Sequence, residues 1–154
     1  EAEFGIVLSR DIQPQHVTLK YILDSIETIY PVIEIHNLIF YGNPPFGAEL
    51  LANNAINAGV VTGRPTNGQI KSKITDLNLI FDKKLIDTWS DKKWPYDMLS
   101  EVEWLVKEQQ KLGKILTKGN LILTGAYGLP IPIKDRALVE AKSSAFGNVS
   151  VIFS

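Results

Sequence analysis

Three glutamates occur in strand-like parts of this sequence, where a buried carboxylate needs a partner. Glu34 lies near the middle of the apolar run 31–40 (PVIEIHNLIF), and Val, Ile and Phe favour a strand in which an unpaired charge is costly. Glu1 and Glu3 lead into a second run at 4–8, and residues two apart in a strand project to one side. If the two strands are neighbours, three carboxylates converge, and a hard cation such as Mg²⁺ or Mn²⁺ relieves their repulsion.

The residues leave other interpretations open. Glu1 and Glu3 could be frayed terminal residues, with Glu34 paired to a lysine. His36 lies two positions after Glu34 and so faces the same side of a regular strand. It could act as a proton donor or as a partner of a carboxylate ligand, or it could simply bond to backbone.

The composition is that of an ordinary globular domain. The chain has 154 residues, 45% of them hydrophobic, and a formal net charge of −1, so we expect a single domain 1–154 and no nucleic-acid partner. The absence of cysteine excludes disulfides, thiolate catalysis and zinc–thiolate sites, and is compatible with a cytoplasmic location. No apolar run reaches the roughly 20 residues of a membrane span. The start, without Met or a leader, is typical of a fragment or a processed product.

Strands outnumber helices in the pattern of the chain. Apolar spacing predicts a helix over 17–29, capped by Thr18 and ended by Pro31, and a second helix over 47–57. Ser100 followed by Glu103 is a capping box and predicts the start of a third helix that stops at Gly113. Strands are predicted over 3–8, 31–40, 60–62, 74–81, 85–89, 120–124, 131–133, 137–141 and 148–153, the fourth and fifth forming a hairpin.

Taken in order, four stretches of the chain resemble the fumarylacetoacetate hydrolase superfamily, most closely its 2-keto-4-pentenoate hydratase and 4-oxalocrotonate decarboxylase branch. Residues 1–8 (EAEFGIVL) are similar to its Glu-x-Glu strand, and 31–35 (PVIEI) to the strand of a third acidic ligand. Residues 52–63 are similar to its Ala-Asp-Asn helix and the glycine segment that follows. Residues 102–105, 119–125 and 146–151 are similar to its C-terminal half.

The resemblance implies an α+β fold, a mixed β-roll or sandwich flanked by short helices. It implies Mg²⁺ or Mn²⁺ on Glu1, Glu3 and Glu34, chelated by the carboxylate and carbonyl of a 2-oxo acid and stabilising an enolate. Asn54, Thr124 and Gly125 fall where the family contacts substrate, and His36 is a candidate catalytic residue.

Three departures mark a divergent branch. The acid/base lysine that the hydratases carry before the Glu-x-Glu strand is not in this chain. Either a preceding segment has been lost, or it is supplied separately, or the activity is absent. The Asp-Ser-Arg pattern after the third ligand is replaced by His36-Asn37-Leu38, and the family's Ala-Asp-Asn by Ala52-Asn53-Asn54. The substrate therefore cannot be copied from the family.

The leading hypothesis is a divalent-metal-dependent lyase, a hydratase of aromatic-compound catabolism acting on a 2-hydroxydienoate or 2-oxo acid. The alternatives are a 2-oxo acid decarboxylase, an acylpyruvate-type hydrolase, or a non-catalytic remnant that binds metal or assembles as a subunit. A homo-oligomer is expected, because a truncated roll exposes strand edges that need cover.

Overall fold

Two antiparallel sheets form the body of the protein in this computed structural model, which describes residues 1–13, 15, 17–43, 45–66, 72–133 and 135–154. The first sheet has the strand order β3-β2-β1-β6, and the second has the order β5-β4-β7-β8. The strands are β1 (Ala2–Leu8), β2 (Ile26–His36), β3 (Asn57–Thr62), β4 (Ile74–Phe81), β5 (Lys84–Lys93), β6 (Leu121–Leu123), β7 (Leu138–Ser143) and β8 (Gly147–Ile152). The helices are α1 (Leu19–Leu23), α2 (Ala48–Ala52), the 3₁₀ turn η2 (Asn54–Ile56) and α3 (Tyr96–Lys111).

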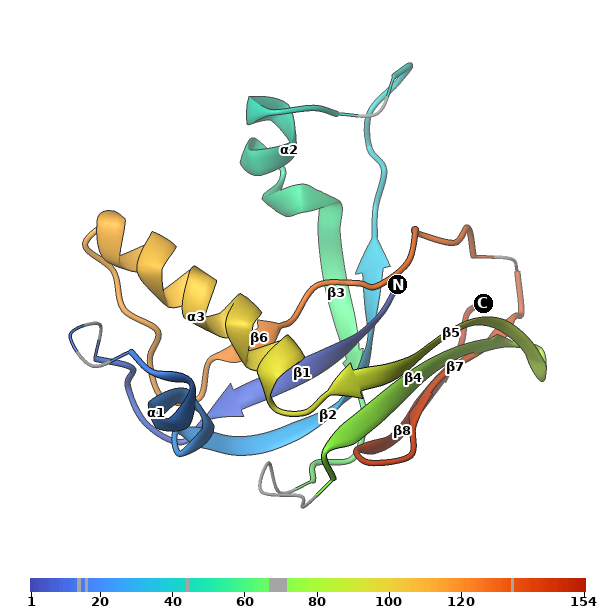
Figure 1. Cartoon of the computed structure of the whole chain (residues 1–154). Helices are drawn as coiled ribbons and strands as arrows, with labels where there is room; N and C mark the ends of the chain where they lie inside the picture. The colour runs from blue at the N-terminus through green and yellow to red at the C-terminus, as the bar shows by residue number, and fades with distance from the viewer. Residues whose placement is uncertain (14, 16, 44, 67–71, 134) are drawn as a thin grey trace.

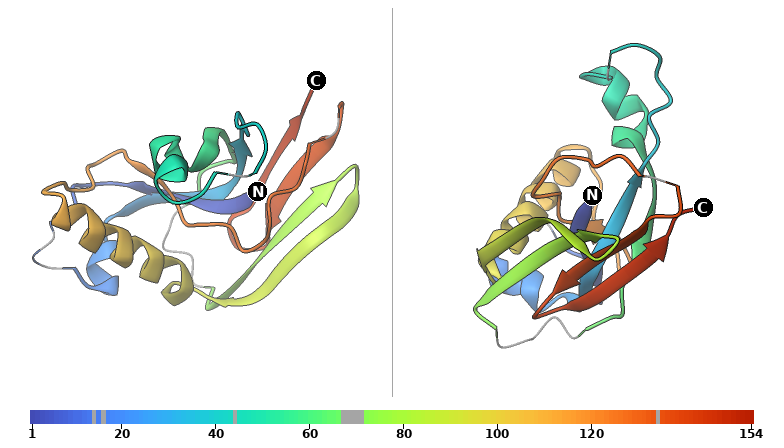
Figure 2. Two further views of the ribbon diagram at one scale, coloured as in Figure 1. Left: turned by 90° about the horizontal axis from the view of Figure 1, so that it is seen from above. Right: turned by 90° about the vertical axis from the view of Figure 1, so that its right-hand side faces the viewer.

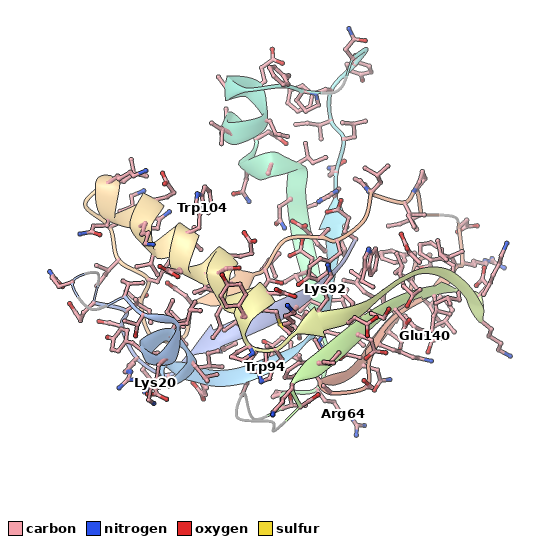
Figure 3. The ribbon with its side chains drawn as sticks, in the orientation of Figure 1. Lys20, Arg64, Lys92, Trp94, Trp104 and Glu140 are labelled. Carbon is pink, nitrogen blue, oxygen red and sulfur yellow. The ribbon has the colours of Figure 1, made fainter. Side chains whose placement is uncertain are left out.

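The long helix α3 and the short helix α1 lie together at one end of the sheets, whereas α2 stands on an arm away from them (Figures 1 and 2). One apolar core joins the two sheets and α3. Phe4 of β1 meets Phe146 edge-on at 5.5 Å between ring centroids, and Trp94 meets the same ring at 4.9 Å. Along α3 the buried side chains are Met98, Leu99, Val102 and Val106. Figure 3 shows Trp94 beneath the start of α3 and Trp104 on its outer side, where Trp104 is exposed.

The helix predicted over 17–29 is wrong beyond its first turns. The Thr18 cap is confirmed, since its Oγ1 accepts from the Tyr21 amide at 3.1 Å, but α1 ends at Leu23. Residues 26–36 instead form the strand between β1 and β3, where their β-branched side chains suit a sheet. Pro31 lies inside this strand and does not precede it. Its carbonyl accepts from Gly63, one residue past the end of β3, so its missing N–H removes only a terminal ladder bond.

Three other local predictions are also wrong. The second helix is limited to α2 and η2, and Gly59 belongs to β3 opposite Ile35. The helix α3 begins at Tyr96, so Ser100 is not its cap; its hydroxyl donates to the Asp97 carbonyl. Residues 131–133 form no strand, because Pro130 and Pro132 have no N–H to donate to a ladder. The β4–β5 hairpin is confirmed.

None of the helices in the described ranges has both the length and the apolar character needed to cross a membrane.

Asp76 of β4 ties the turn between β7 and β8 to the second sheet. Its carboxylate accepts from the Ser144 amide at 2.8 Å and from the Ser144 hydroxyl, and it accepts from the Asn78 side chain at 3.0 Å. Burial acts to raise the pKa of Asp76, but these hydrogen bonds from Ser144 and Asn78 outweigh it and lower the pKa below 3.8.

We expect Asp76→Asn to reduce the free energy of unfolding by about 1 kcal/mol at pH 7, because one amide N–H₂ then faces the donors of Ser144 or Asn78. A depressed pKa gives stability that is present above the unfolded pKa and lost as the pH falls through the folded pKa. The difference between variant and wild type should therefore shrink below pH 4. Urea unfolding at pH 7 and pH 3 measures it, with the exposed Asp91→Asn as control; an equal difference at both pH values would contradict the prediction.

Candidate metal centre

Glu1 and Glu34 face each other across the β1–β2 ladder. The register pairs Ala2 with Ile33, and the ladder continues by one more pair, in which the Glu34 amide donates to the Glu1 carbonyl at 2.9 Å and the Glu1 nitrogen donates to the Glu34 carbonyl at 3.0 Å. Residues directly opposite in a ladder project to the same side. The two carboxylates are therefore brought together by the backbone.

His36 and Glu3 flank this pair on opposite sides. Each lies two residues along its own strand, so alternation places both side chains on the same side as the pair. Because the strands are antiparallel, Glu3 falls toward the middle of the sheet and His36 toward its end. Glu3 is 3% exposed, whereas the His36 side chain is 18% exposed.

The His36 ring closes the outer part of the site. Its Nε2 lies 3.4 Å from Glu1 Oε2 and 3.2 Å from Glu34 Oε2. The other oxygen of Glu34, Oε1, accepts a hydrogen bond from the Asn57 side chain at 2.6 Å. One ligand atom from each of Glu1, Glu34 and His36 lies within 4.8 Å of the others. The partners of Glu34 thus include an imidazole and an amide, and no lysine of the described residues pairs with it.

Glu3 lies behind this group and is held by backbone. Its Oε2 accepts from the Gly125 amide at 2.8 Å. Gly125 follows β6 with φ +88°, a conformation that glycine adopts readily. The predicted site residues Glu1, Glu34 and His36 are therefore gathered in one group, with Glu3 and Gly125 bonded to each other next to it.

Burial and mutual repulsion shift the pKa values of the three carboxyl groups by different amounts and in different directions. Burial, with a hydrogen bond to Glu34 and the charge of Glu34, raises the pKa of Glu3 to about 8. Burial also raises the pKa of Glu1, against the lowering effect of His36. For Glu34, burial acts upward, but hydrogen bonds with Asn57 and Glu3 and the nearby His36 bring its pKa below 4.5. The opposite directions of these two shifts favour the proton on Glu3 and the charge on Glu34.

An apolar cavity of about 510 Å³ opens beside the group. Glu1, Glu34 and His36 are the only titratable side chains among its lining residues in the described part of the chain. Its walls come from both sheets and from the segment after β6, and include Ile33, Leu79, Phe81, Ile131, Val139 and Phe153. That segment passes close to the N-terminus in both views (Figures 1 and 2).

The predicted substrate residues occupy different places. Asn54 is exposed in η2 and is not among the residues that line the cavity, whereas its neighbour Ile56 is. Thr124 is 5% exposed and bonds through its amide to the Phe4 carbonyl at 3.1 Å. Its buried Oγ1 has no hydrogen-bond partner among the described residues.

Sequence reasoning missed the role of Asn57 as a hydrogen-bond partner of Glu34, and most of the cavity wall. Asn57 follows η2 and reaches Glu34 only because β3 pairs with β2. The wall residues of β4 and β7 belong to the other sheet, and no local signal connects them to the glutamates. A signal did exist at 130–133, where a Pro-Ile-Pro-Ile sequence is too apolar for an ordinary solvated loop.

The donor set fits a divalent cation. Two carboxylates and an imidazole point one atom each at a common volume, partly shielded from water, at one end of a cavity that could admit a small ligand. Carboxylate oxygens are ligands of Mg²⁺ and Mn²⁺ in proteins, and neutral imidazole is a ligand of the later first-row divalent ions.

The sequence of the chain is similar to those of several proteins named as hydratases. No family model matches it. It is 29% identical over 159 aligned residues to the 2-keto-4-pentenoate hydratase of Paraburkholderia xenovorans LB400, spanning 99% of this chain and 58% of the relative. It is 23% identical to the TodF product hydratase of Pseudomonas putida F1, spanning 100% of this chain and 58% of the relative. The chain thus covers less than two thirds of the curated relatives it matches.

Several solved structures have a backbone fold similar to that of this chain. The 4-oxalocrotonate decarboxylase of Pseudomonas putida G7, complexed with magnesium and adipate, superposes with a TM-score of 0.82 at 19% identity, covering all of this chain and 59% of that one. The fumarylacetoacetate hydrolase of Exiguobacterium antarcticum superposes with a TM-score of 0.71 at 13% identity, covering all of this chain and 55% of that one. The chain has the fumarylacetoacetate hydrolase fold. The resemblance and the α+β class inferred from the sequence are confirmed.

Within this fumarylacetoacetate hydrolase fold, the protonated Glu3 can be tested by an isosteric amide. Glu3→Gln keeps an acceptor for the Gly125 amide and a donor for Glu34, so in metal-free protein we expect its unfolding free energy to stay within about 0.5 kcal/mol of wild type. Glu3→Ala leaves the Gly125 amide and the half-buried Glu34 without this partner and should lose about 1–3 kcal/mol. Urea unfolding at pH 7 compares them; equal losses for both variants would contradict the assignment.

Proposed function

We propose that this chain carries a divalent-metal-dependent lyase activity, a hydratase that adds the elements of water across a carbon–carbon double bond of a 2-hydroxydienoate or 2-oxo acid. The observation that carries the proposal is the group Glu1, Glu34 and His36 at one end of the apolar cavity of about 510 Å³. The similarity to proteins named 2-keto-4-pentenoate hydratase over 99% of the chain supports it.

Glu1 and Glu34 would hold the metal ion, and Glu3 stays the predicted third acidic ligand. A bound divalent ion supplies Lewis-acid chemistry, polarising the carbonyl oxygen of a 2-oxo acid. A solved neighbour of the same fold, a 4-oxalocrotonate decarboxylase, is complexed with magnesium in one structure and with calcium in another, which supports a divalent ion here.

The chain's own residues would bind and orient the substrate. The carboxylate and carbonyl end belongs at the glutamates, since that is the polar end of the cavity. The hydrocarbon end would lie against apolar walls such as Leu79 and Phe81, which exclude water from the diene. Thr124 remains a predicted substrate contact, because its buried hydroxyl needs a partner. Asn54 also remains a prediction; its exposure means that a substrate contact would require the arm to move.

The test combines activity and binding. With Mg²⁺ or Mn²⁺ present, we expect the ultraviolet absorbance of 2-hydroxypenta-2,4-dienoate to fall as its conjugation is lost, and a chelator to stop the reaction. Glu34→Gln should reduce kcat/KM by about 100-fold or more, since it removes a ligand charge. The matched control is Glu103→Gln, a glutamate on the outer part of α3 paired with Lys107, which should leave the rate unchanged.

The products decide between reactions on the same site. Release of CO₂ would indicate a decarboxylase, and release of a second acid would indicate an acylpyruvate-type hydrolase. Calorimetry should show tighter metal binding with oxalate, which mimics the two oxygens of a 2-oxo acid. Binding without any turnover would overturn the hydratase and leave a non-catalytic metal-binding chain; no binding at millimolar metal would overturn the whole proposal.

We also propose that the chain assembles with copies of itself. The arm that carries α2 exposes Tyr41, Phe46 and Leu51, which are large apolar side chains that an isolated monomer would leave in water (Figure 1). Light scattering should show a mass above that of one chain. Protein concentrations of roughly 1–100 μM cover the range in which such assemblies commonly form. Phe46→Asp should lower this mass, and a lone monomer for wild type at the highest concentration would refute the proposal.

A further inference from the structure

We propose that His36 is itself a ligand of the metal ion, so that the site presents one nitrogen and carboxylate oxygens and selects a divalent transition ion over Mg²⁺. This inference rests on the proposed metal site and adds the identity of one donor and the class of ion. The resemblance to the hydratases implies carboxylate ligands alone, and His36 belongs to a segment where this chain departs from their pattern.

The first argument is the position of the ring. Nε2 of His36 lies 3.4 Å from Glu1 Oε2 and 3.2 Å from Glu34 Oε2. Two ligands about 2.1 Å from a common octahedral ion, at right angles to each other, lie about 3 Å apart. Both distances therefore match neighbouring coordination positions after shifts of a few tenths of an ångström. Glu3, in contrast, gives one of its oxygens to the Gly125 amide.

The second argument is the surroundings of the three donors. Asn57 holds the far oxygen of Glu34, so Oε2 stays directed toward the ring. The side chains of Glu1, Glu34 and His36 are 13%, 12% and 18% exposed, so each has lost most of its water. The same three residues line the cavity of about 510 Å³, which leaves room for further ligands beside them.

The third argument concerns ion preference. Mg²⁺ strongly prefers oxygen ligands, whereas imidazole suits the later first-row ions, and affinity rises from Mn²⁺ to Co²⁺ in nearly any site. A nitrogen donor increases this difference in affinity between the ions further. The ratio of Co²⁺ to Mg²⁺ affinity is thus the quantity that His36 would control.

The competing role for His36 makes the opposite prediction. If the ring only forms ion pairs with Glu1 and Glu34, it competes with any cation for their oxygens, and removing it would tighten metal binding. If the ring is a ligand, removing it weakens the binding of Co²⁺ and Mn²⁺ and affects Mg²⁺ little. The sign of the change in affinity separates the two roles.

Calorimetric titration of wild type and His36→Gln with Co²⁺, Mn²⁺ and Mg²⁺ at one pH tests this. We expect His36→Gln to weaken Co²⁺ binding by about 10-fold or more and Mg²⁺ binding by less than about 3-fold. His36→Asp, which replaces the nitrogen donor with an oxygen donor, should move the affinity ratio further toward Mg²⁺. Asn57→Asp is a control within the site, because it changes a partner of Glu34 without changing the nitrogen donor.

A spectroscopic readout makes the test independent of affinity. Mn²⁺ bound to wild type should show ¹⁴N modulation of its electron spin echo, and His36→Gln should lose it. The inference is overturned if Mn²⁺ binds, Glu34→Gln abolishes that binding, and yet no ¹⁴N coupling is found or His36→Gln tightens binding; the proposed metal site would then stand. If Mn²⁺ does not bind wild type at all, the proposed function fails together with the inference.

Discussion

The antiparallel pairing of β1 with β2 is the constraint on which the site depends. It places Glu1 opposite Glu34 by two backbone hydrogen bonds, and alternation along each strand then adds Glu3 and His36 to the same side. A slip of one residue in this register would send one strand's carboxylates to the other face of the sheet. The buried neighbours Phe4 and Ile6 prevent the slip, because it would also turn them out of the core.

Four ionisable side chains in one place work against folding, and the structure shows how their repulsion is reduced. Burial and the neighbouring Glu34 raise the pKa of Glu3 to about 8, which favours its neutral form beside Glu34. Asn57 and the Gly125 amide supply donors to the remaining oxygens, and His36 lies against both outer carboxylates. These partners come from β2, β3 and the end of β6, so the whole first sheet contributes to holding the group. A fold selected for stability alone would place apolar residues here.

The second sheet contributes no donor to the group, but it builds most of the cavity wall. Leu79 and Phe81 of β4 and Val139 of β7 line the same cavity as Glu1 and Glu34 of the first sheet. The polar end and the apolar wall are therefore supplied by different layers. This separation allows the apolar wall to change while the backbone register keeps the glutamates together, which agrees with a fold shared by a decarboxylase and a hydrolase.

Sequence alone determined the residue types of the site and much of the fold. The Glu-x-Glu spacing, Glu34 in an apolar run and His36 two residues later predict side chains on one side of neighbouring strands, and the β4–β5 hairpin follows from local alternation. These features could be predicted because each depends on neighbouring residues in the chain or on the pairing of two strands only. The extent of α1 was not predictable in this way, because residues 24–29 carry a helical spacing that pairing with β1 overrides.

Only the tertiary structure decided which donors meet. Asn57, the Gly125 amide and the cavity wall reach the glutamates through β3, β6 and the opposing sheet, and the depth of Glu3 relative to His36 follows from the antiparallel direction of β2. The physical reason is that burial and hydrogen bonding are properties of packed neighbours. A sequence lists the groups that need partners, whereas the packing of strands far apart in the chain assigns the partners.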